Sequence, residues 1–228
     1  MGIRILKDLQ EKEQTRALYE QNFEDPKIFI DYYYHEKCKD NLILVKEEEG
    51  QILSMLHLNP YLVSVCGNRV KSFYIFAVAT DKNHRHEGHM TELLRAAFSY
   101  MKDQKIPFCF LLPVEVAIYE WIGFFVLCDL ARERDDSGLP TGRERMEEIE
   151  DNYDIYCVRD ERYRELLEIE DALARQGVKE DLPEHPLIMV KIIDPVLFAE
   201  MAGLKKTTTE EEEEQWMRSK RCYFSEEV

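Results

Sequence analysis

The stretch Val78-Ala-Thr-Asp-Lys-Asn-His-Arg-His-Glu-Gly-His-Met-Thr-Glu-Leu-Leu94 decides how this chain is read. The apolar run Phe73–Thr80 leads into it, and the apolar spacing after it predicts an amphipathic helix over Gly88–Gln104. A short polar loop thus connects a buried strand to a helix. At the helix N-terminus, unpaired N–H groups and the helix dipole favour the binding of a phosphate. Gly88 would let the backbone approach a ligand closely. On the loop alone, an ordinary strand-to-helix connection is the better interpretation.

Outward from this stretch, apolar periodicity predicts an α/β (mixed α+β) fold, a central mixed sheet flanked by helices. Strands are expected at Ile3–Leu6, Asn41–Glu48, Gln51–Leu58, Tyr61–Cys66, Arg69–Thr80, Pro107–Val114, Phe124–Leu130, Tyr153–Val158 and Leu187–Ile193. Helices are expected at Gln10–Phe23, Gly88–Gln104, Glu115–Ile122, Glu161–Gln176 and Pro195–Ala202. A further helix is expected to start at Pro26, with Asp25 as its N-cap, and to run through Cys38. Thr209 and Glu212 form a capping box that starts one more helix.

The composition changes after Leu130. Residues 131–152 are charged and include Gly138, Pro140 and Gly142, which is typical of a linker or an excursion loop. We therefore expect a ligand-binding, catalytic unit over residues 1–130. A smaller α/β extension is expected over residues 153–228, and its tail could return to the site.

Charge and cysteine content limit the classes of partner. A formal charge of −16 argues against a nucleic-acid partner, because phosphate contacts need clustered Lys and Arg. The negative charge has two interpretations. It attracts a cationic small molecule, or it only keeps the surface solvated, and both stay open. The six cysteines form no CxxC pair, so we expect no metal site, no disulfide scaffold and a reducing cytoplasm.

The sequence also bears on the membrane and on assembly. No apolar run is long enough to span a bilayer, and the charged N-terminus lacks the apolar core of a signal peptide. We therefore expect no membrane partner. A homo-oligomer is compatible with the sequence, which does not decide it.

Two segments carry a resemblance to a known family. Arg85-His-Glu-Gly-His-Met90 resembles the acyl-CoA signature of the GNAT superfamily of N-acetyltransferases, [Arg/Gln]-x-x-Gly-x-[Gly/Ala]. Met90 departs from the small last residue, although that position mainly contributes its N–H. Ile118-Tyr-Glu-Trp-Ile-Gly-Phe124 resembles the second landmark, Tyr-Glu-x-x-Gly-Phe. The resemblance covers roughly residues 1–130. It is strongest to the Eis-type acetyltransferases, which are much longer, so their complete sterol-carrier-like domain is not expected here.

The resemblance implies acetyl-CoA as co-substrate. Its pantetheine arm would add to the strand edge through the backbone of Val78 and Thr80, because that strand would part from Phe108–Leu112. A main-chain N–H near Val78 or Ala79 would stabilise the tetrahedral oxyanion. The pyrophosphate would lie on the N–H groups of Arg85, His86, Glu87, Gly88, His89 and Met90.

The resemblance also implies the catalytic groups. Tyr119 would protonate the departing thiolate, where the alternative is simple packing. The base would be the terminal carboxylate of Val228, with Tyr223 and Phe224 anchoring the tail, where the alternative is a frayed terminus. Glu115 and His57 are the other candidate bases, although a His in an apolar strand is more often a satisfied core residue.

The sequence thus predicts an acetyl-CoA-dependent N-acetyltransferase that acts on a primary amine of a small cationic acceptor. One alternative is a catalytically weak, acyl-CoA-binding regulatory protein, which Tyr119 argues against and Met90 mildly favours. A second is an interaction protein whose core resembles the family by chance.

Overall fold

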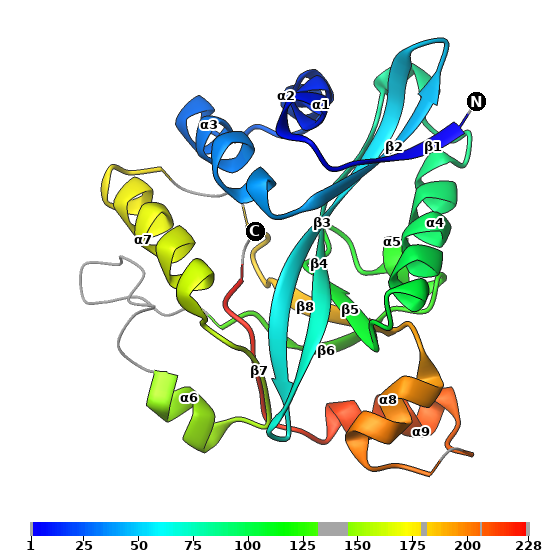
Figure 1. Ribbon diagram of the computed structural model, residues 1–228, viewed down its shortest axis with the longest axis vertical. Coiled ribbons are helices and arrows are strands. Elements are labelled where there is room, and N and C mark those ends of the chain that lie inside the picture. The colour runs from blue at the N-terminus through cyan, green and yellow to red at the C-terminus, as the bar shows by residue number, and fades with distance from the viewer. Residues whose placement is uncertain (1, 132–145, 179–181, 206, 227–228) are drawn as a thin grey trace.

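The long hairpin of β3 (Gln51–Val65) and β4 (Asn68–Thr80) forms the centre of one sheet (Figure 1). The computed structural model describes residues 2–131, 146–178, 182–205 and 207–226. Within these residues, nine strands join in the order β1-β2-β3-β4-β5-β8-β6, and β7 pairs with both β3 and β9. The pairs β4–β5 and β7–β9 are parallel and the others antiparallel, which confirms the predicted mixed α/β fold.

The other strands are shorter, and all but the last were expected from the apolar pattern. They are β1 (Gly2–Leu6), β2 (Leu42–Glu48), β5 (Phe108–Leu111), β6 (Phe125–Asp129), β7 (Ile155–Cys157), β8 (Leu187–Ile192) and β9 (Cys222–Tyr223). β9 lies beside β7 because the C-terminal segment folds back onto the sheet.

The two strands predicted at Gln51–Leu58 and Tyr61–Cys66 are one continuous strand, so that prediction was wrong. Pro60 lies in the gap between the two predicted strands. In the structure it lies between the part of β3 that pairs with β2 and the part that pairs with β7. One side of the strand has no described strand partner there, so a residue without an N–H is tolerated.

The first helical region is more broken than its periodicity suggested. It consists of α1 (Leu9–Lys12), the 3-10 turn η1 (Glu13–Thr15) and α2 (Arg16–Asn22). The buried Thr15 hydroxyl contacts the Lys12 carbonyl oxygen at 2.7 Å and the Tyr34 hydroxyl at 2.9 Å. A side chain that bonds back to the preceding turn competes with the helical ladder, which accounts for the interruption.

The next helix, α3 (Lys27–His35), begins at a different cap from the predicted one. Its N-cap is Pro26, without a side-chain capping bond, and Asp25 instead accepts a hydrogen bond from the Tyr19 hydroxyl at 2.7 Å. The helix ends before Cys38, which lies in the 3-10 turn η2 (Lys37–Lys39).

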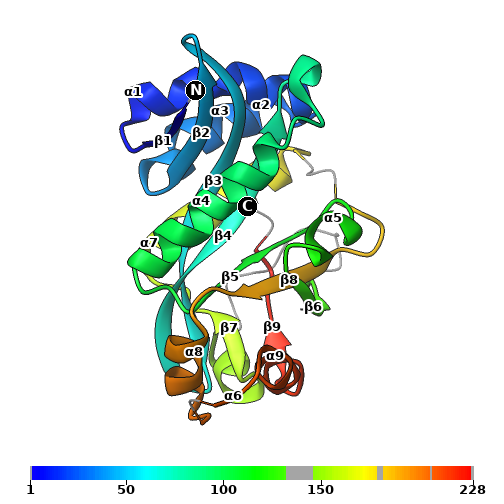
Figure 2. The same cartoon turned by 90° about the vertical axis from the view of Figure 1, so that its right-hand side faces the viewer.

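Helices cover both sides of the central hairpin (Figure 1). On one side lies α4 (His89–Asp103). Of the apolar stripe predicted for this helix, Leu93, Leu94, Ala97 and Met101 are buried, and Phe98 is partly buried. On the other side, α2 and α3 bury an aromatic cluster against the sheet. Figure 2 shows α4 crossing β3 and β4 near the point where the strands of the sheet spread apart.

The C-terminal part of the chain adds strands to the same sheet. β8 lies between β5 and β6, and β7 pairs with β3. Its helices are α6 (Met146–Asn152), α7 (Glu161–Arg175), α8 (Pro195–Ala202) and α9 (Glu210–Arg218), and the capping box predicted at Thr209 and Glu212 is present. The predicted loop over residues 131–152 therefore ends in a helix, because Ile149 is buried.

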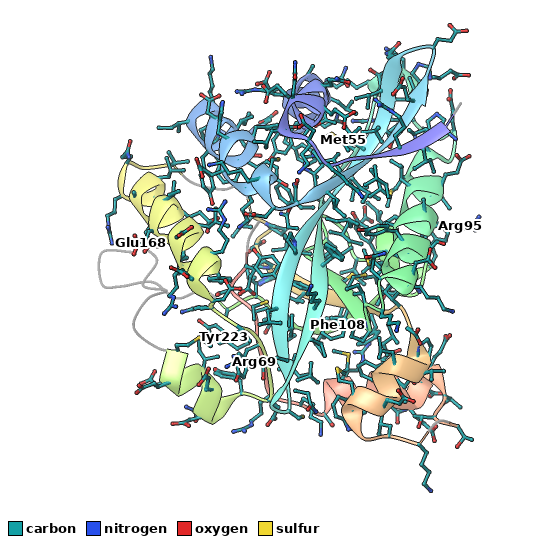
Figure 3. The ribbon with its side chains drawn as sticks, in the orientation of Figure 1. Met55, Arg69, Arg95, Phe108, Glu168 and Tyr223 are labelled. Atoms are coloured by element: carbon teal, nitrogen blue, oxygen red, sulfur yellow. The ribbon has the colours of Figure 1, made fainter. Side chains whose placement is uncertain are left out.

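Side chains divide in the expected way between interior and surface. Phe108 and Tyr223 lie inside, whereas Arg95 and Glu168 lie on the outer sides of α4 and α7 (Figure 3). Among the described residues, no helix combines the length and the apolar character needed to cross a bilayer.

Candidate functional site

β4 and β5 run side by side along only part of β4. Their pairing covers Phe73 with Cys109 and Tyr74 with Phe110, and β4 then continues to Thr80. Residues 75–80 therefore keep β3 on one edge, and on the other edge no described strand pairs with them. An open edge offers backbone N–H and C=O groups to an extended ligand.

The same part of β4 carries an irregularity in its pairing with β3. The register shifts between Met55 and His57, so Ala77 and Val78 together lie opposite Leu56. This is a β-bulge, which withdraws backbone groups from the ladder and re-aims them. Ala77 has φ 48°, in the left-handed region. That conformation costs a non-glycine residue roughly 1–2 kcal/mol.

The loop after β4 is held by bonds of its own. The Asp81 side chain accepts the Asn83 N–H at 2.8 Å, and the Asp81 carbonyl accepts the His84 N–H at 2.9 Å, which closes the 3-10 turn η3 (Lys82–His84). The Asn83 N–H also lowers the pKa of the Asp81 carboxyl group. Arg85 donates to the side-chain oxygen of Asn22 at 2.7 Å, which ties the loop to the end of α2.

The loop ends at Gly88, the N-cap of α4. Its φ of 85° lies in the left-handed region that favours glycine, and no side-chain hydrogen bond caps the helix. A Cβ added at Gly88 would meet no atom within 4 Å, so the space above it is open. The first N–H groups of α4 therefore lack a capping side chain among the described residues. The fold thus places the end of β4 and the start of α4 on either side of one short loop.

Tyr119 lies on α5 (Ala117–Glu120), directly after β5. Its ring packs edge-on against Phe124, with the centroids 5.7 Å apart. Burial raises the pKa of Tyr119 to about 12, so its hydroxyl is protonated at neutral pH. Gly123 ends the segment with φ 88°, and a Cβ there would lie 2.6 Å from Lys191 Nζ. The positive φ favours glycine at this position, whereas Lys191 Nζ is the end of a flexible side chain that can move aside.

The C-terminal tail enters the interior. Tyr223 is 7% exposed and Phe224 is fully buried, with its ring 5.0 Å from that of Phe110. The Phe224 carbonyl accepts the Ala131 N–H at 2.7 Å. Glu226 is 5% exposed and accepts a hydrogen bond from the Tyr163 hydroxyl at 2.8 Å. The tail is therefore packed, not frayed, through Glu226, whereas Val228 lies outside the described residues.

These elements agree with what the sequence itself matches. Residues 3–127, more than half of the chain, match the family model described as "Acetyltransferase (GNAT) domain". The chain belongs to the GNAT acetyltransferases. A search of curated proteins finds no match to the sequence.

Solved structures share this GNAT fold at low sequence identity. A probable N-acyltransferase of unknown function from Enterococcus faecalis V583 is 18% identical, with a TM-score of 0.51 over 57% of this chain and 34% of that one. Eis1 from Mycobacterium abscessus is 17% identical, with a TM-score of 0.54 over 75% and 49%. Aminoglycoside 6'-acetyltransferase type Ii is 11% identical, with a TM-score of 0.52 over 86% and 99%. The matched part of the chain thus spans about a third of the first protein and half of the second.

The residues of this chain fit the co-substrate of a GNAT enzyme. The open edge of β4 can receive an extended amide chain, and the uncapped start of α4 can receive phosphate oxygens. The open space above Gly88 leaves room for the phosphates.

The two alternative bases lie in very different surroundings. Glu115 is exposed in the connection between β5 and α5. His57 is fully buried, and its Nδ1 lies 3.0 Å from the Tyr33 hydroxyl. Burial lowers the pKa of His57 to about 3, so its ring is neutral and belongs to the aromatic core.

Two features of the structure lack a clear signal in the sequence. The bulge at Ala77 has no sequence signal, since no glycine marks it. Glu226 was read only as part of the tail, yet burial raises the pKa of its carboxyl group. The sole available hint was its position directly after the apolar pair Tyr223 and Phe224.

Proposed function

We propose that this GNAT enzyme acetylates a primary amine of a small cationic acceptor by direct transfer from acetyl-CoA through a tetrahedral intermediate. The observation that carries the proposal is the parting of β4 from β5 beside the uncapped start of α4. This juxtaposition provides an open strand edge and a phosphate-binding helix start in one continuous segment.

The backbone positions the co-substrate in this proposal. Val78 and Thr80 bond the pantetheine arm, and the N–H groups of residues 85–90 receive the pyrophosphate. The bulge supports an oxyanion role for the N–H of Val78 or Ala79, because it removes backbone groups of β4 from the β3 ladder.

Tyr119 protonates the departing thiolate in this proposal. A general acid must hold its proton until the transition state. The raised pKa of Tyr119 supports that role, because the hydroxyl stays protonated over the physiological range.

The tail supplies the base in this proposal. The terminal carboxylate of Val228 takes the proton of the incoming ammonium, and the burial of Tyr223 and Phe224 supports such a path by directing the tail into the interior. A carboxylate becomes a better base when it is partly desolvated, because burial raises its pKa. Glu115 is the next candidate.

The acceptor class rests on charge. A net charge of −16 attracts a cationic molecule and raises its encounter rate. The name of aminoglycoside 6'-acetyltransferase type Ii agrees with an amino-sugar acceptor, which is small and cationic.

A regulatory acyl-CoA-binding protein is the second candidate, and Met90 favours it because the family signature has a small residue there. One experiment separates the two. Acetyl-CoA is incubated with a library of amines, and the free thiol of CoA is measured. The proposal predicts release that depends on cationic amines. Tight binding of acetyl-CoA without amine-dependent release would favour the regulatory protein.

A further inference from the structure

Three side chains of the loop before α4 converge on one point. His84 ends η3, Glu87 lies in the loop, and His89 is the first residue of α4. One carboxylate oxygen, Oε2 of Glu87, lies 3.4 Å from His84 Nδ1 and 3.1 Å from His89 Nε2. The three donor atoms all lie within 4.8 Å of one another.

These distances meet the criteria for hydrogen-bonded charge pairs, and they also fit the ligand shell of a metal ion. Ligand atoms about 2.0–2.2 Å from a tetrahedral zinc ion lie roughly 3.3–3.6 Å apart. The two contacts of Glu87 are already close to that separation, so coordination requires mainly that the two imidazole nitrogens move together. His84 is partly exposed, so its ring can make that movement.

The surroundings differ on the two sides of the cluster. The His89 side chain is 3% exposed, and its Nδ1 is buried without a hydrogen-bond partner among the described atoms. A metal would bind at Nε2, the nitrogen that faces Glu87, so the buried ring would supply a ligand atom held in place by its packing. Glu87 is half exposed, so the outer side of the cluster is open to water or to a phosphate oxygen.

We propose that His84, Glu87 and His89 bind a zinc ion and that this ion strengthens the binding of acetyl-CoA. Two imidazoles and one carboxylate with an open fourth position are a donor set that Zn²⁺ accepts. The coupling rests on the proposed function, because Glu87 lies within the proposed pyrophosphate loop. Its carboxylate repels a pyrophosphate, and a bound divalent cation reverses the sign of the local charge.

The first experiment tests the ion alone. The full chain, freed of metal, is titrated with Zn²⁺ against a chromophoric chelator and with Co²⁺ by visible absorption. We expect one equivalent to bind, with the d–d bands of a tetrahedral cobalt site and without cobalt–thiolate charge transfer. Thiolate bands would place the ion on the cysteines and overturn the site.

Matched variants locate the ligands. His84→Ala and Glu87→Gln should each weaken Zn²⁺ binding by about 100-fold or more, since even the loss of an outer-shell partner costs 10–100-fold. Both residues are exposed enough that the fold should tolerate the change. His86→Ala, in the same loop but outside the cluster, should leave Zn²⁺ affinity within about threefold, well below the effect of losing a ligand. Equal Zn²⁺ affinity in wild type, His84→Ala and Glu87→Gln would overturn the proposal.

The second experiment tests the coupling by calorimetry with acetyl-CoA, which has no free thiol to chelate zinc. Saturating Zn²⁺ should raise acetyl-CoA affinity at least about fivefold, the lower end for coupled sites. In Glu87→Gln that response should disappear. An unchanged or lower affinity of the zinc-loaded wild type would refute the coupling. Zinc binding without any binding of acetyl-CoA would instead refute the proposed cofactor loop and leave the zinc site intact.

Discussion

The two halves of β4 differ in their strand pairing. Residues 68–74 have strand partners, with β3 along one edge and β5 reaching Phe73 and Tyr74 on the other. Residues 75–80 leave β5, contain a bulge and run into the loop that starts α4. The difference shows how a regular sheet acquires a binding site, because backbone groups become available to a ligand where strand pairing stops.

Gly67, just before β4, and Gly88, at the start of α4, allow a matched comparison. Gly67 and Gly88 have φ of 84° and 85°, and an added Cβ would meet nothing within 4 Å at either position. Gly88→Asp should lower acetyl-CoA affinity at least about 10³-fold, the effect of losing two charge-assisted hydrogen bonds of about 2 kcal/mol each. Gly67→Asp carries the same backbone strain and the same charge. Calorimetry that found equal affinities in the two variants would show that the open half of β4 is not the cofactor site.

The tail offers a second way to test the open half. A few residues added after Val228 would convert its carboxylate to an amide and should lower kcat by about 10²-fold or more, the usual effect of a positioned base. Folding and acetyl-CoA affinity should be unchanged, because Tyr223 and Phe224 keep their packing. The same residues added at the N-terminus are the control. Full activity of the C-terminally extended enzyme would contradict the role of Val228 as the base, and Glu115 would then be the next candidate.

Tyr119 can be compared with a tyrosine that is expected only to pack. Tyr119→Phe should lower kcat by about 10²-fold while acetyl-CoA still binds. Tyr100→Phe on α4 should change kcat by less than about threefold, since it removes no catalytic proton. Because burial raises the pKa of Tyr119 to about 12, its proton stays bound as the pH rises to 10. This assignment would be contradicted if kcat of the wild type fell with rising pH at an apparent pKa near 9 and kcat of Tyr119→Phe did not.

The smallest expected effect concerns the bulge. Ala77 and Ala79 are both 5% exposed on β4, but only Ala77 has a positive φ. Ala79→Gly should lower the free energy of unfolding by about 1 kcal/mol, through lost burial and added chain entropy. Ala77→Gly loses the same methyl group but relieves roughly 1–2 kcal/mol of backbone strain, so its net effect should be close to zero. Equal destabilisation of the two variants in urea unfolding would show that Ala77 is not strained.

Local patterns were enough to predict much of this fold. The amphipathic stripe from Leu93 to Met101 and the capping box of α9 depend on residues close in sequence, and the structure has them. The elements that were missed depend on distant partners. Pro60 is tolerated because of where β2 and β7 end, and β9 exists because β7 lies beside it.

The features of the site also differ in whether they depend on neighbouring residues or on distant partners. The loop from Arg85 to Met90 could be singled out because its chemistry lies in consecutive residues, and Gly88 at the start of α4 has a left-handed conformation that glycine favours. The bulge at Ala77 and the burial of Glu226 arise from the pairing of β3 and from Tyr163, neither of which the local sequence encodes. A bulge changes the pairing of backbone groups, so the pattern of apolar and polar residues in the sequence does not predict it.

The most direct test of the central claim is backbone hydrogen exchange, read by mass spectrometry with and without acetyl-CoA. The account predicts slower exchange within residues 75–80 and 85–90 when acetyl-CoA is bound, because these amides gain ligand acceptors. Residues 69–74, already paired in the sheet, should show no change. Protection confined to other segments, or equal protection of both halves of β4, would contradict the claim that the ligand binds where the pairing of β4 stops.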